Sequence, residues 1–252
     1  MAESRKTTKQ KIVCALTRRE GKPIKCHIVP RSFYEDMLDQ EDGPCRLYSN
    51  IPGTYVRRIP VGGYDAGIVT LEGERILSRY DDYASDLLLK NVEALQPFMV
   101  KDNLEAWRIK QYDYKLLKGF VLSLLWRMHV STRKEYIKVQ LADYMEEELR
   151  KIIIEEKEID PDRYSVILCR WLDKGFGPVM LNPDRPREKG VNFYRVFFGI
   201  YFALIKVDRR PTPDPFSEFM LTPGKDLQII SKDLKESKEW QLMGKIARAN
   251  EK

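Results

Sequence analysis

The sequence predicts an α+β protein in which a small N-terminal module of short strands and a helix packs on a larger helical domain with a C-terminal antiparallel sheet. Three observations favour this class. Short apolar runs separated by Gly and Pro occupy the N-terminus, three- and four-residue apolar spacing dominates from 74 to 154, and short apolar runs return after Pro161. We therefore predict two units, residues 1–100 and 101–252, with the boundary where the helical core begins.

The first elements are two short strands and a short helix. Apolar segments 12–16 and 24–29 flank a turn that contains Gly and Pro, which predicts a β-hairpin. Ser32 has Glu35 three residues later, the spacing of a capping box, so we expect a short helix to start there. The stretch 40–63 is rich in Gly, Pro and Asn and is predicted to form an irregular loop.

The later elements follow from a change in the apolar period. Three- and four-residue spacing predicts helices, and the second of these is apolar almost all round, so we expect it to be buried. Shorter apolar runs predict strands after Pro161. The predicted helices cover 74–88, 104–129 and 141–154, the predicted strands cover 166–172, 179–181, 191–198 and 200–207, and an amphipathic helix ends the chain.

Composition argues against a membrane-spanning or disulfide-rich protein. The longest strongly apolar run, 196–205, is far shorter than the about 20 residues of a membrane helix. No apolar stretch follows the basic residues within 1–11, so a secretory signal is not expected. The four cysteines show no paired C-x-x-C spacing. We therefore expect a cytoplasmic protein with reduced thiols and no membrane partner.

The net charge of +6 is concentrated at the N-terminal end. Residues 1–31 contain nine Lys and Arg but only two acidic residues, Glu3 and Glu20. A clustered basic surface attracts polyanions through charge neutralisation and counterion release, so nucleic acid is the expected partner. A solvated terminal arm explains the same charge equally well, and charge alone leaves both interpretations open.

The sequence contains two histidines in different surroundings. His129 lies in the apolar segment 104–129 without an acidic or Cys partner at helical spacing, which is typical of a histidine at the edge of a core. His27 follows Cys26 on a predicted strand and has Lys and Arg nearby on both sides. Cationic neighbours favour the neutral imidazole and attract phosphate, so His27 suits a general base acting on water near a phosphodiester.

Four segments of the chain carry a recognisable pattern. One reads Lys25-Cys26-His27-Ile28-Val29-Pro30, and a second reads Gly63-Tyr64-Asp65-Ala66-Gly67-Ile68. A third reads Arg79-Tyr80-Asp81-Asp82-Tyr83-Ala84, and the fourth is the apolar segment 120–131. Together they resemble bacterial HNH, or ββα-metal, endonucleases, whose first half has a C-x-x-C knuckle followed by His-Ile-Ile-Pro. The resemblance covers at least 12–131 and implies that the N-terminal unit is a ββα module.

The resemblance implies roles for four residues. His27 would be the general base that activates water, and Asp65 would orient His27 or hold a metal ion. Glu74, on the first turn of a helix, and Cys26 would be metal ligands. A single Mg²⁺ or Mn²⁺ held there would polarise the scissile phosphate and stabilise the leaving oxygen. The thiol of Cys26 is a soft ligand for either ion.

The structural zinc site of the family is degenerate in this sequence. Of its four cysteine positions, Cys14 keeps a thiol, while Thr17, Thr70 and Gly73 stand at the other three. Zinc needs four N, S or O donors to close a tetrahedral site, so we expect no structural zinc. Apolar packing of the module against the larger body is expected to replace the metal.

Two functions are open at this stage. The resemblance implies a metal-dependent nuclease that hydrolyses DNA in preference to RNA, within a defence system against phage or plasmids. The alternative is a catalytically inactive HNH-fold component that binds nucleic acid or a protein partner, since a pure scaffold would leave the basic cluster without a purpose. In either case 101–252 is the expected specificity or partner-binding region. The expected phosphate contacts are Lys22, Lys25, Arg31, Arg57 and Arg58.

Overall fold

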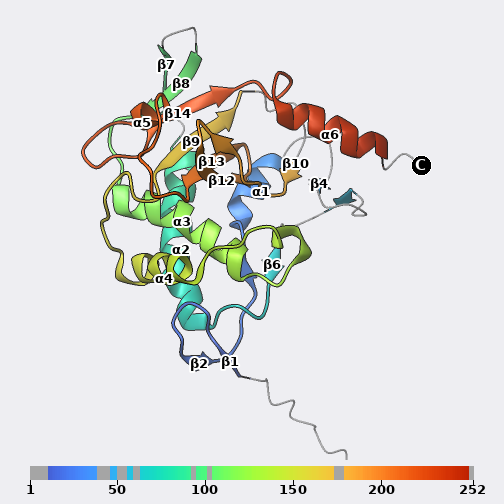
Figure 1. Ribbon diagram of the computed structural model, residues 1–252. Coiled ribbons are helices and arrows are strands. Elements are labelled where there is room, and N and C mark those ends of the chain that lie inside the picture. The colour runs from blue at the N-terminus through green and yellow to red at the C-terminus, as the bar shows by residue number, and fades with distance from the viewer. Residues whose placement is uncertain are drawn as a thin grey trace, which may run out of the picture.

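The computed structural model describes residues 11–38, 46–49, 56–58, 63–91, 95–100, 104–172 and 179–249 (Figure 1). Over these residues it combines helices with a seven-stranded sheet, so the predicted α+β class is confirmed. Helices α2 (Leu71–Ser85), α3 (Tyr114–Val130) and α4 (Asp143–Glu155) pack on one another, and α3 also packs against the sheet strands β12 (Val191–Phe198) and β13 (Tyr201–Lys206). The described helices include none that is long and apolar enough to cross a bilayer.

The N-terminal strands pair differently from the predicted hairpin. Strand β1 (Ile12–Val13) pairs with β2 (Glu20–Gly21), whereas β3 (Cys26–His27) pairs with β6 (Tyr64–Asp65), both antiparallel. The hairpin predicted between 12–16 and 24–29 is therefore wrong. The chain turns earlier than predicted, at residues 14–19. There Arg18 adopts a φ of 59° and the Arg19 carbonyl accepts from the Cys14 amide at 2.9 Å.

The segment after β3 contains one helix and two short strands. Helix α1 (Arg31–Leu38) begins one residue before the predicted cap Ser32, whose hydroxyl instead lies 2.6 Å from that of Ser85. Strands β4 (Arg46–Tyr48) and β5 (Arg57–Arg58) pair with each other, and β4 also pairs with β10 (Val179–Leu181). The other residues of the predicted loop 40–63 lie outside the described residues, apart from Ser49, Val56 and Gly63.

The seven-stranded sheet has the order β11-β12-β13-β9-β14-β8-β7. All neighbouring strands are antiparallel except β9 and β14, which are parallel, so the predicted antiparallel sheet is wrong at this pair. Strand β13 pairs with one edge of β9 and β14 pairs with the other edge. The connection between β13 and β14 contains α5 (Phe216–Phe219), and β14 runs in the same direction as β9. The other strands are β7 (Gln96–Val100), β8 (Leu104–Ile109), β9 (Val166–Trp171), β11 (Arg187–Glu188) and β14 (Leu227–Lys232).

Most later elements match the predicted periods, with one exception. The helix predicted over 104–129 begins at Tyr114, where the Asp113 side chain accepts from the Leu116 amide at 2.9 Å. Its first part is strand β8, which is held between β7 and β14. The remaining predicted helices and strands are confirmed to within a few residues, and they include the C-terminal helix α6 (Lys238–Ala249).

The N-terminal module shares its core with the rest of the chain. Phe33 of α1 stacks on Phe120 of α3 with ring centroids 5.5 Å apart, and it meets Phe198 of β12 edge-on at 5.3 Å. The β12–β13 turn fits against this cluster because Gly199 has a φ of 64° and a Cβ there would lie 2.6 Å from the Phe33 carbonyl oxygen. The boundary near residue 100 stays a prediction, and the buried core runs across it.

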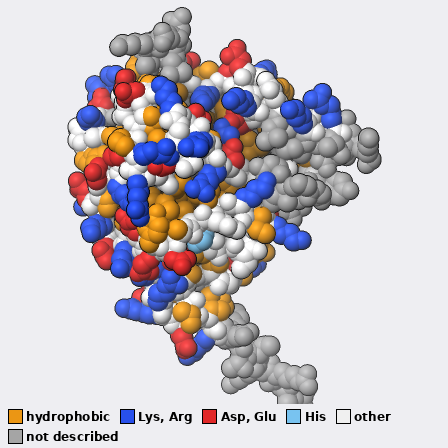
Figure 2. All heavy atoms as spheres, viewed as in Figure 1, with side chains coloured by type: hydrophobic (Ala, Val, Ile, Leu, Met, Phe, Trp, Pro, Cys, Tyr) orange, Lys and Arg blue, Asp and Glu red, His pale blue; other side chains and the backbone are white. Residues whose placement is uncertain are grey.

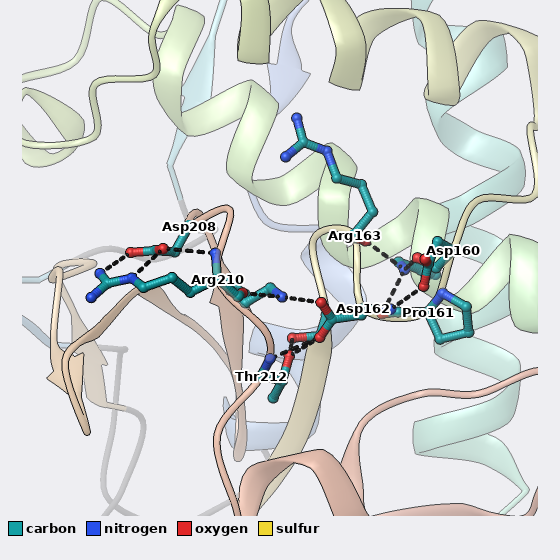
Figure 3. Close-up of polar contacts among 10 residues, drawn as sticks. Asp160, Pro161, Asp162, Arg163, Asp208, Arg210 and Thr212 are labelled. Carbon is teal, nitrogen blue, oxygen red and sulfur yellow. Dashed lines mark hydrogen bonds and ion pairs between the residues drawn. The ribbon is translucent and has the colours of Figure 1, made fainter.

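Two buried lysines hold the loops beside α3 in place. Lys118 donates to carbonyl groups of the loop 160–163 at 2.9 to 3.3 Å. Lys206 donates to the Asp162 carboxylate at 2.6 Å and to the Arg210 carbonyl at 2.8 Å. Figure 3 shows how these loops face each other, with Asp162 directed at the loop that carries Arg210. Because a buried ammonium group must find oxygen partners, this network fixes the shape of both loops.

The close approach of α2 and α3 depends on a glycine. A Cβ on Gly119 of α3 would lie 2.3 Å from a ring carbon of Tyr80 on α2. The ring has little freedom to move away, since Tyr80 is buried and its hydroxyl donates to the Ile153 carbonyl at 2.7 Å. The contact between the two helices therefore leaves no room for a side chain at position 119.

We expect Gly119→Ala to lower the free energy of unfolding by about 1–3 kcal/mol, because overpacking forces the helices apart. Gly244→Ala in α6 is the matched control, since the nearest atom to its Cβ would be 3.9 Å away. Alanine favours a helix by about 1 kcal/mol over glycine, so the control should be neutral or slightly stabilised. Urea denaturation followed by circular dichroism measures both, and equal behaviour of the two variants would contradict the packing argument.

Candidate functional site

Two paired strands and the helix that follows the second strand carry the candidate site around His27. Strands β3 and β6 place Cys26 opposite Asp65 and His27 opposite Tyr64, and the Ile28 amide donates to the Gly63 carbonyl at 2.9 Å. Helix α2 then begins at Leu71. The predicted residues of the site therefore lie on β3, β6 and α2, while α1, β4 and β5 lie between β3 and β6 in the chain.

The four positions that the resemblance assigns to a zinc site, Cys14, Thr17, Thr70 and Gly73, also come together. The Cys14 thiol accepts from the Thr17 amide at 3.4 Å, and a Cβ on Gly73 would lie 2.8 Å from the Cys14 sulfur. Burial raises the pKa of Cys14, but hydrogen bonds from Thr17 and Thr70 outweigh it and the pKa lies below its ordinary value. One thiol with two hydroxyl-bearing neighbours and a glycine does not suit tetrahedral zinc. Packing and hydrogen bonds close this end of the module instead.

A buried arginine lies at the centre of the candidate site. The Arg127 guanidinium, on α3, makes two hydrogen bonds with the Asp81 carboxylate of α2, at 2.6 and 2.9 Å. It also donates to the His27 carbonyl at 3.0 Å, and its side chain is 1% exposed. Burial lowers the pKa of Arg127, but Asp81 more than offsets this, so its pKa lies above the ordinary value and the group is cationic.

Cys26 and Glu74 face each other beside this pair. Burial raises the pKa of the Cys26 thiol well above its ordinary value, and Glu74 adds to the effect. Burial likewise raises the pKa of Glu74, although Cys26 and Arg127 oppose it. The Oε2 atom of Glu74 is buried without a hydrogen-bond partner. Sulfur is in addition a soft ligand, whereas Mg²⁺ and Mn²⁺ prefer oxygen.

Asp65 points to a different part of the molecule. Its carboxylate accepts from the Thr132 amide at 2.8 Å, from the Thr132 hydroxyl at 2.9 Å, from the Ser131 hydroxyl at 3.1 Å and from the Gly67 amide at 3.0 Å. Burial raises its pKa, but these hydrogen bonds together lower it below its ordinary value. Asp65 therefore joins β6 to the end of α3, and its oxygen atoms are occupied.

His27 itself is half-buried at the end of β3. Burial and the positive charge of Arg31 lower the pKa of its imidazole, Arg127 adds to this, and Asp81 opposes it. The ring meets Tyr64 edge-on with centroids 6.3 Å apart. The imidazole is consequently neutral near pH 7, the state that a general base requires. His129, in contrast, accepts from the Leu141 amide at 3.2 Å and has a structural role.

These side chains do not suit a divalent cation held by protein ligands. Asp65 is turned away, Cys26 is a neutral thiol, and Arg127 adds positive charge beside Glu74 and Asp81. Within the described part of the chain, no group of three or more His, Cys, Asp or Glu side chains is placed to hold a metal ion. The predicted Mg²⁺ or Mn²⁺ site stays a prediction, and the donors present do not favour it.

The predicted phosphate contacts differ in their surroundings. Lys22 and Lys25 are exposed, and the Lys25 ammonium lies 4.8 Å from the centre of the Tyr64 ring. Arg31 is exposed but pairs with Glu35 at 2.6 Å. The backbone of Arg57 and Arg58 forms β5, and their side chains lie outside what the structure describes.

Comparisons of the chain with family models, with curated proteins and with solved structures found no match. The geometry of this site and the resemblance of its motifs are therefore the basis for inferring a function.

The motif pattern predicts no role for Arg127 or Asp81, although both lie in its segments. A signal was present, because Arg127 is a charged residue in a helix that is apolar almost all round, and such a residue needs a buried partner. Asp81 is one of several acidic residues on α2, and the sequence does not indicate which of them is the partner.

We expect Arg127→Met to lower the free energy of unfolding by about 3–5 kcal/mol, because it leaves Asp81 as an uncompensated buried charge. Replacing both residues in Arg127→Met/Asp81→Leu should recover much of the loss. Arg79→Met is the control, since Arg79 pairs with Glu156 at the surface and such pairs contribute less than about 1 kcal/mol. Urea denaturation of the four proteins tests this, and similar losses for Arg127→Met and Arg79→Met would contradict it.

We expect Asp65→Asn to lower stability at pH 7 by about 1–3 kcal/mol, because the amide nitrogen meets amide and hydroxyl donors that the carboxylate satisfied. Since the pKa of Asp65 is lowered on folding, its contribution is present above the ordinary value of 3.8 and is lost as the pH falls through the folded value. The variant should therefore lose less stability than the parent below about pH 4. Denaturation at a series of pH values measures this, and parallel pH curves would refute it.

Proposed function

We propose that this chain is a nucleic-acid-binding component built on an HNH-like ββα frame, and that it binds phosphate backbone without metal-dependent hydrolysis. One observation carries the proposal. The Arg127 guanidinium lies among Cys26, Glu74 and Asp81 and supplies, from within the protein, the positive charge that a metal ion would supply. A nuclease of this type needs that charge at the scissile phosphate, whereas Arg127 is buried and paired.

Electrostatics supports this assignment. A divalent cation beside a buried guanidinium experiences strong repulsion in a medium of low dielectric constant. Two of the acidic groups that would offset the repulsion are engaged elsewhere, since Asp81 forms two hydrogen bonds with Arg127 and Asp65 accepts from Ser131 and Thr132. Glu74 is the acidic group that faces Cys26 beside Arg127, and burial raises the pKa of its carboxyl, which weakens the negative charge it offers a cation.

The binding part of the proposal is supported by the outer face of the same module. Lys22 and Lys25 are exposed close to the half-buried His27, and Lys25 lies over the Tyr64 ring, which is 37% exposed. Cations interleaved with an exposed aromatic ring suit a phosphate backbone with its bases. Elsewhere in the basic N-terminal segment, Arg18 and Arg19 pair with acidic residues.

A second candidate, the HNH-like nuclease with His27 as general base, is favoured by one observation. The imidazole is half-buried, and its pKa is lowered so that it is neutral near pH 7. This is the state in which it would accept a proton from water. The geometry supports this candidate less well, since the Asp65 carboxylate is bound to Ser131 and Thr132 and the Glu74 carboxyl faces Cys26.

A cleavage and binding experiment on the full chain separates the two candidates. We expect the protein to shift labelled DNA in a salt-sensitive manner and to leave supercoiled plasmid intact in Mg²⁺ or Mn²⁺. His27→Ala should change neither result by more than about twofold, because the imidazole performs no proton transfer in this proposal. Nicking that requires Mn²⁺ and is lost in His27→Ala would establish the nuclease instead. Absence of DNA binding at low salt would contradict the proposal that the protein binds nucleic acid.

A further inference from the structure

A second basic surface is formed by residues between 142 and 210, outside the His27 module. It consists of exposed residues in the loop 183–190 and the loop 207–210, together with the first turn of α4. We propose that this basic loop surface binds a single strand of nucleic acid through its phosphates, with a base stacked on Tyr144. The inference deepens the proposed function and rests on it. The cations concerned are Arg185, Arg187, Lys189 and Arg209.

Two arginines of this surface are oriented by tyrosine rings instead of carboxylates. The Arg185 guanidinium lies 5.6 Å from the centre of the Tyr194 ring, and that of Arg209 lies 5.4 Å from the Tyr144 ring. Neither has a carboxylate partner among the residues that the structure describes. An arginine stacked on an aromatic ring keeps its planar set of donors free for a phosphate, and it loses less rotamer freedom on binding.

The two arginine–tyrosine pairs lie on one continuous surface. The Tyr194 hydroxyl accepts from the Gln140 amide at 3.0 Å and donates to the Gln140 carbonyl at 2.8 Å. Gln140 is four residues before Tyr144. The segment 140–144 therefore carries one of the two rings and is hydrogen-bonded to the other. The loops also touch, since a Cβ on Gly190 would lie 3.6 Å from a guanidinium nitrogen of Arg210.

The loop that carries Arg209 is held rigidly from below. Asp162 accepts from the Thr212 amide at 2.8 Å and from the Thr212 hydroxyl at 2.6 Å, as Figure 3 shows. Lys206 anchors the same loop through the Arg210 carbonyl. A loop fixed in this way presents its cations before the ligand arrives, which reduces the entropy lost on binding.

Most acidic groups of this region are neutralised internally. Arg195 pairs with Asp184, and Arg210 pairs with Asp208. Among the described residues of the two loops and the first turn of α4, this leaves Glu188 and Asp143 as the acidic residues without an ion-pair partner. Figure 2 shows Lys and Arg side chains gathered over the part of this face where β12, β13 and their loops lie. A positive surface of this kind attracts a polyanion and releases its counterions.

The aromatic component distinguishes a single strand from other polyanions. Tyr144 is 50% exposed although Arg209 covers part of its ring. Base stacking on an exposed ring requires an unpaired base, which a duplex does not offer. A lipid surface would supply phosphates but no base, so the chemistry of the surface favours a nucleic-acid strand.

The test measures binding of a fluorescein-labelled 20-nucleotide DNA strand and of its duplex by anisotropy at several salt concentrations. Arg185→Ala/Arg209→Ala should weaken binding of the strand about tenfold and reduce the salt slope by about one to two units. The control is Lys110→Ala/Lys225→Ala, which removes the same charge from two exposed sites. These sites are next to β8 and β14, and strands β13 and β9 separate β14 from β12 in the sheet. The control should change the affinity by less than about twofold.

Tyr144→Ala should weaken binding of the single strand about tenfold and binding of the duplex less. Tyr144→Phe should bind the single strand like the parent protein, because the ring remains. If the arginine variant and its control bind the strand equally while the parent protein binds, the inference fails and the proposed function stands. If the parent protein binds neither DNA, the proposed function fails as well. If the arginine variant loses binding to phosphatidylserine vesicles but not to DNA, the surface recognises lipid and the inference is overturned.

Discussion

The buried pair of Arg127 and Asp81 is the constraint on which the candidate site depends. A guanidinium without access to water requires a charged partner, and here one group joins α3 to α2 and to the end of β3. It positions the backbone of His27 and sets the electrostatic environment of Cys26 and Glu74. The same interaction that holds the module on the helices therefore also balances the charges of its site.

The module is closed without the donors of a structural zinc ion. The positions that would carry zinc ligands converge, but Cys14 is surrounded by Thr17, Thr70 and the bare backbone of Gly73. A free-standing module of this size depends on its metal for folding. Here the larger body takes over that role, because Arg150 of α4 donates to the Leu16 carbonyl at 2.8 Å and Phe33 lies in the common core.

Buried charges have a second use in the C-terminal part of the chain. Lys118 and Lys206 are hidden beneath surface loops and satisfy their hydrogen bonds with carbonyl and carboxylate oxygens of those loops. Loops held in this way are part of the packed structure, and the exposed arginines that they carry have defined positions. The protein thus uses these interior cations to hold its surface loops in place.

The sequence by itself determined the α+β class, helices α2 and α4, strands β9, β12 and β13, and the motif around His27, because local apolar periods and adjacent residues record these features. Only the tertiary structure decided that β3 pairs with β6, that 104–109 forms a strand, that Asp65 turns toward Ser131 and Thr132, and that Arg127 lies in the site. Arg127 is 46 residues from Asp81 and 100 from His27. Contacts over such separations leave no trace in a local pattern, since they depend on which surfaces the packed elements bring together.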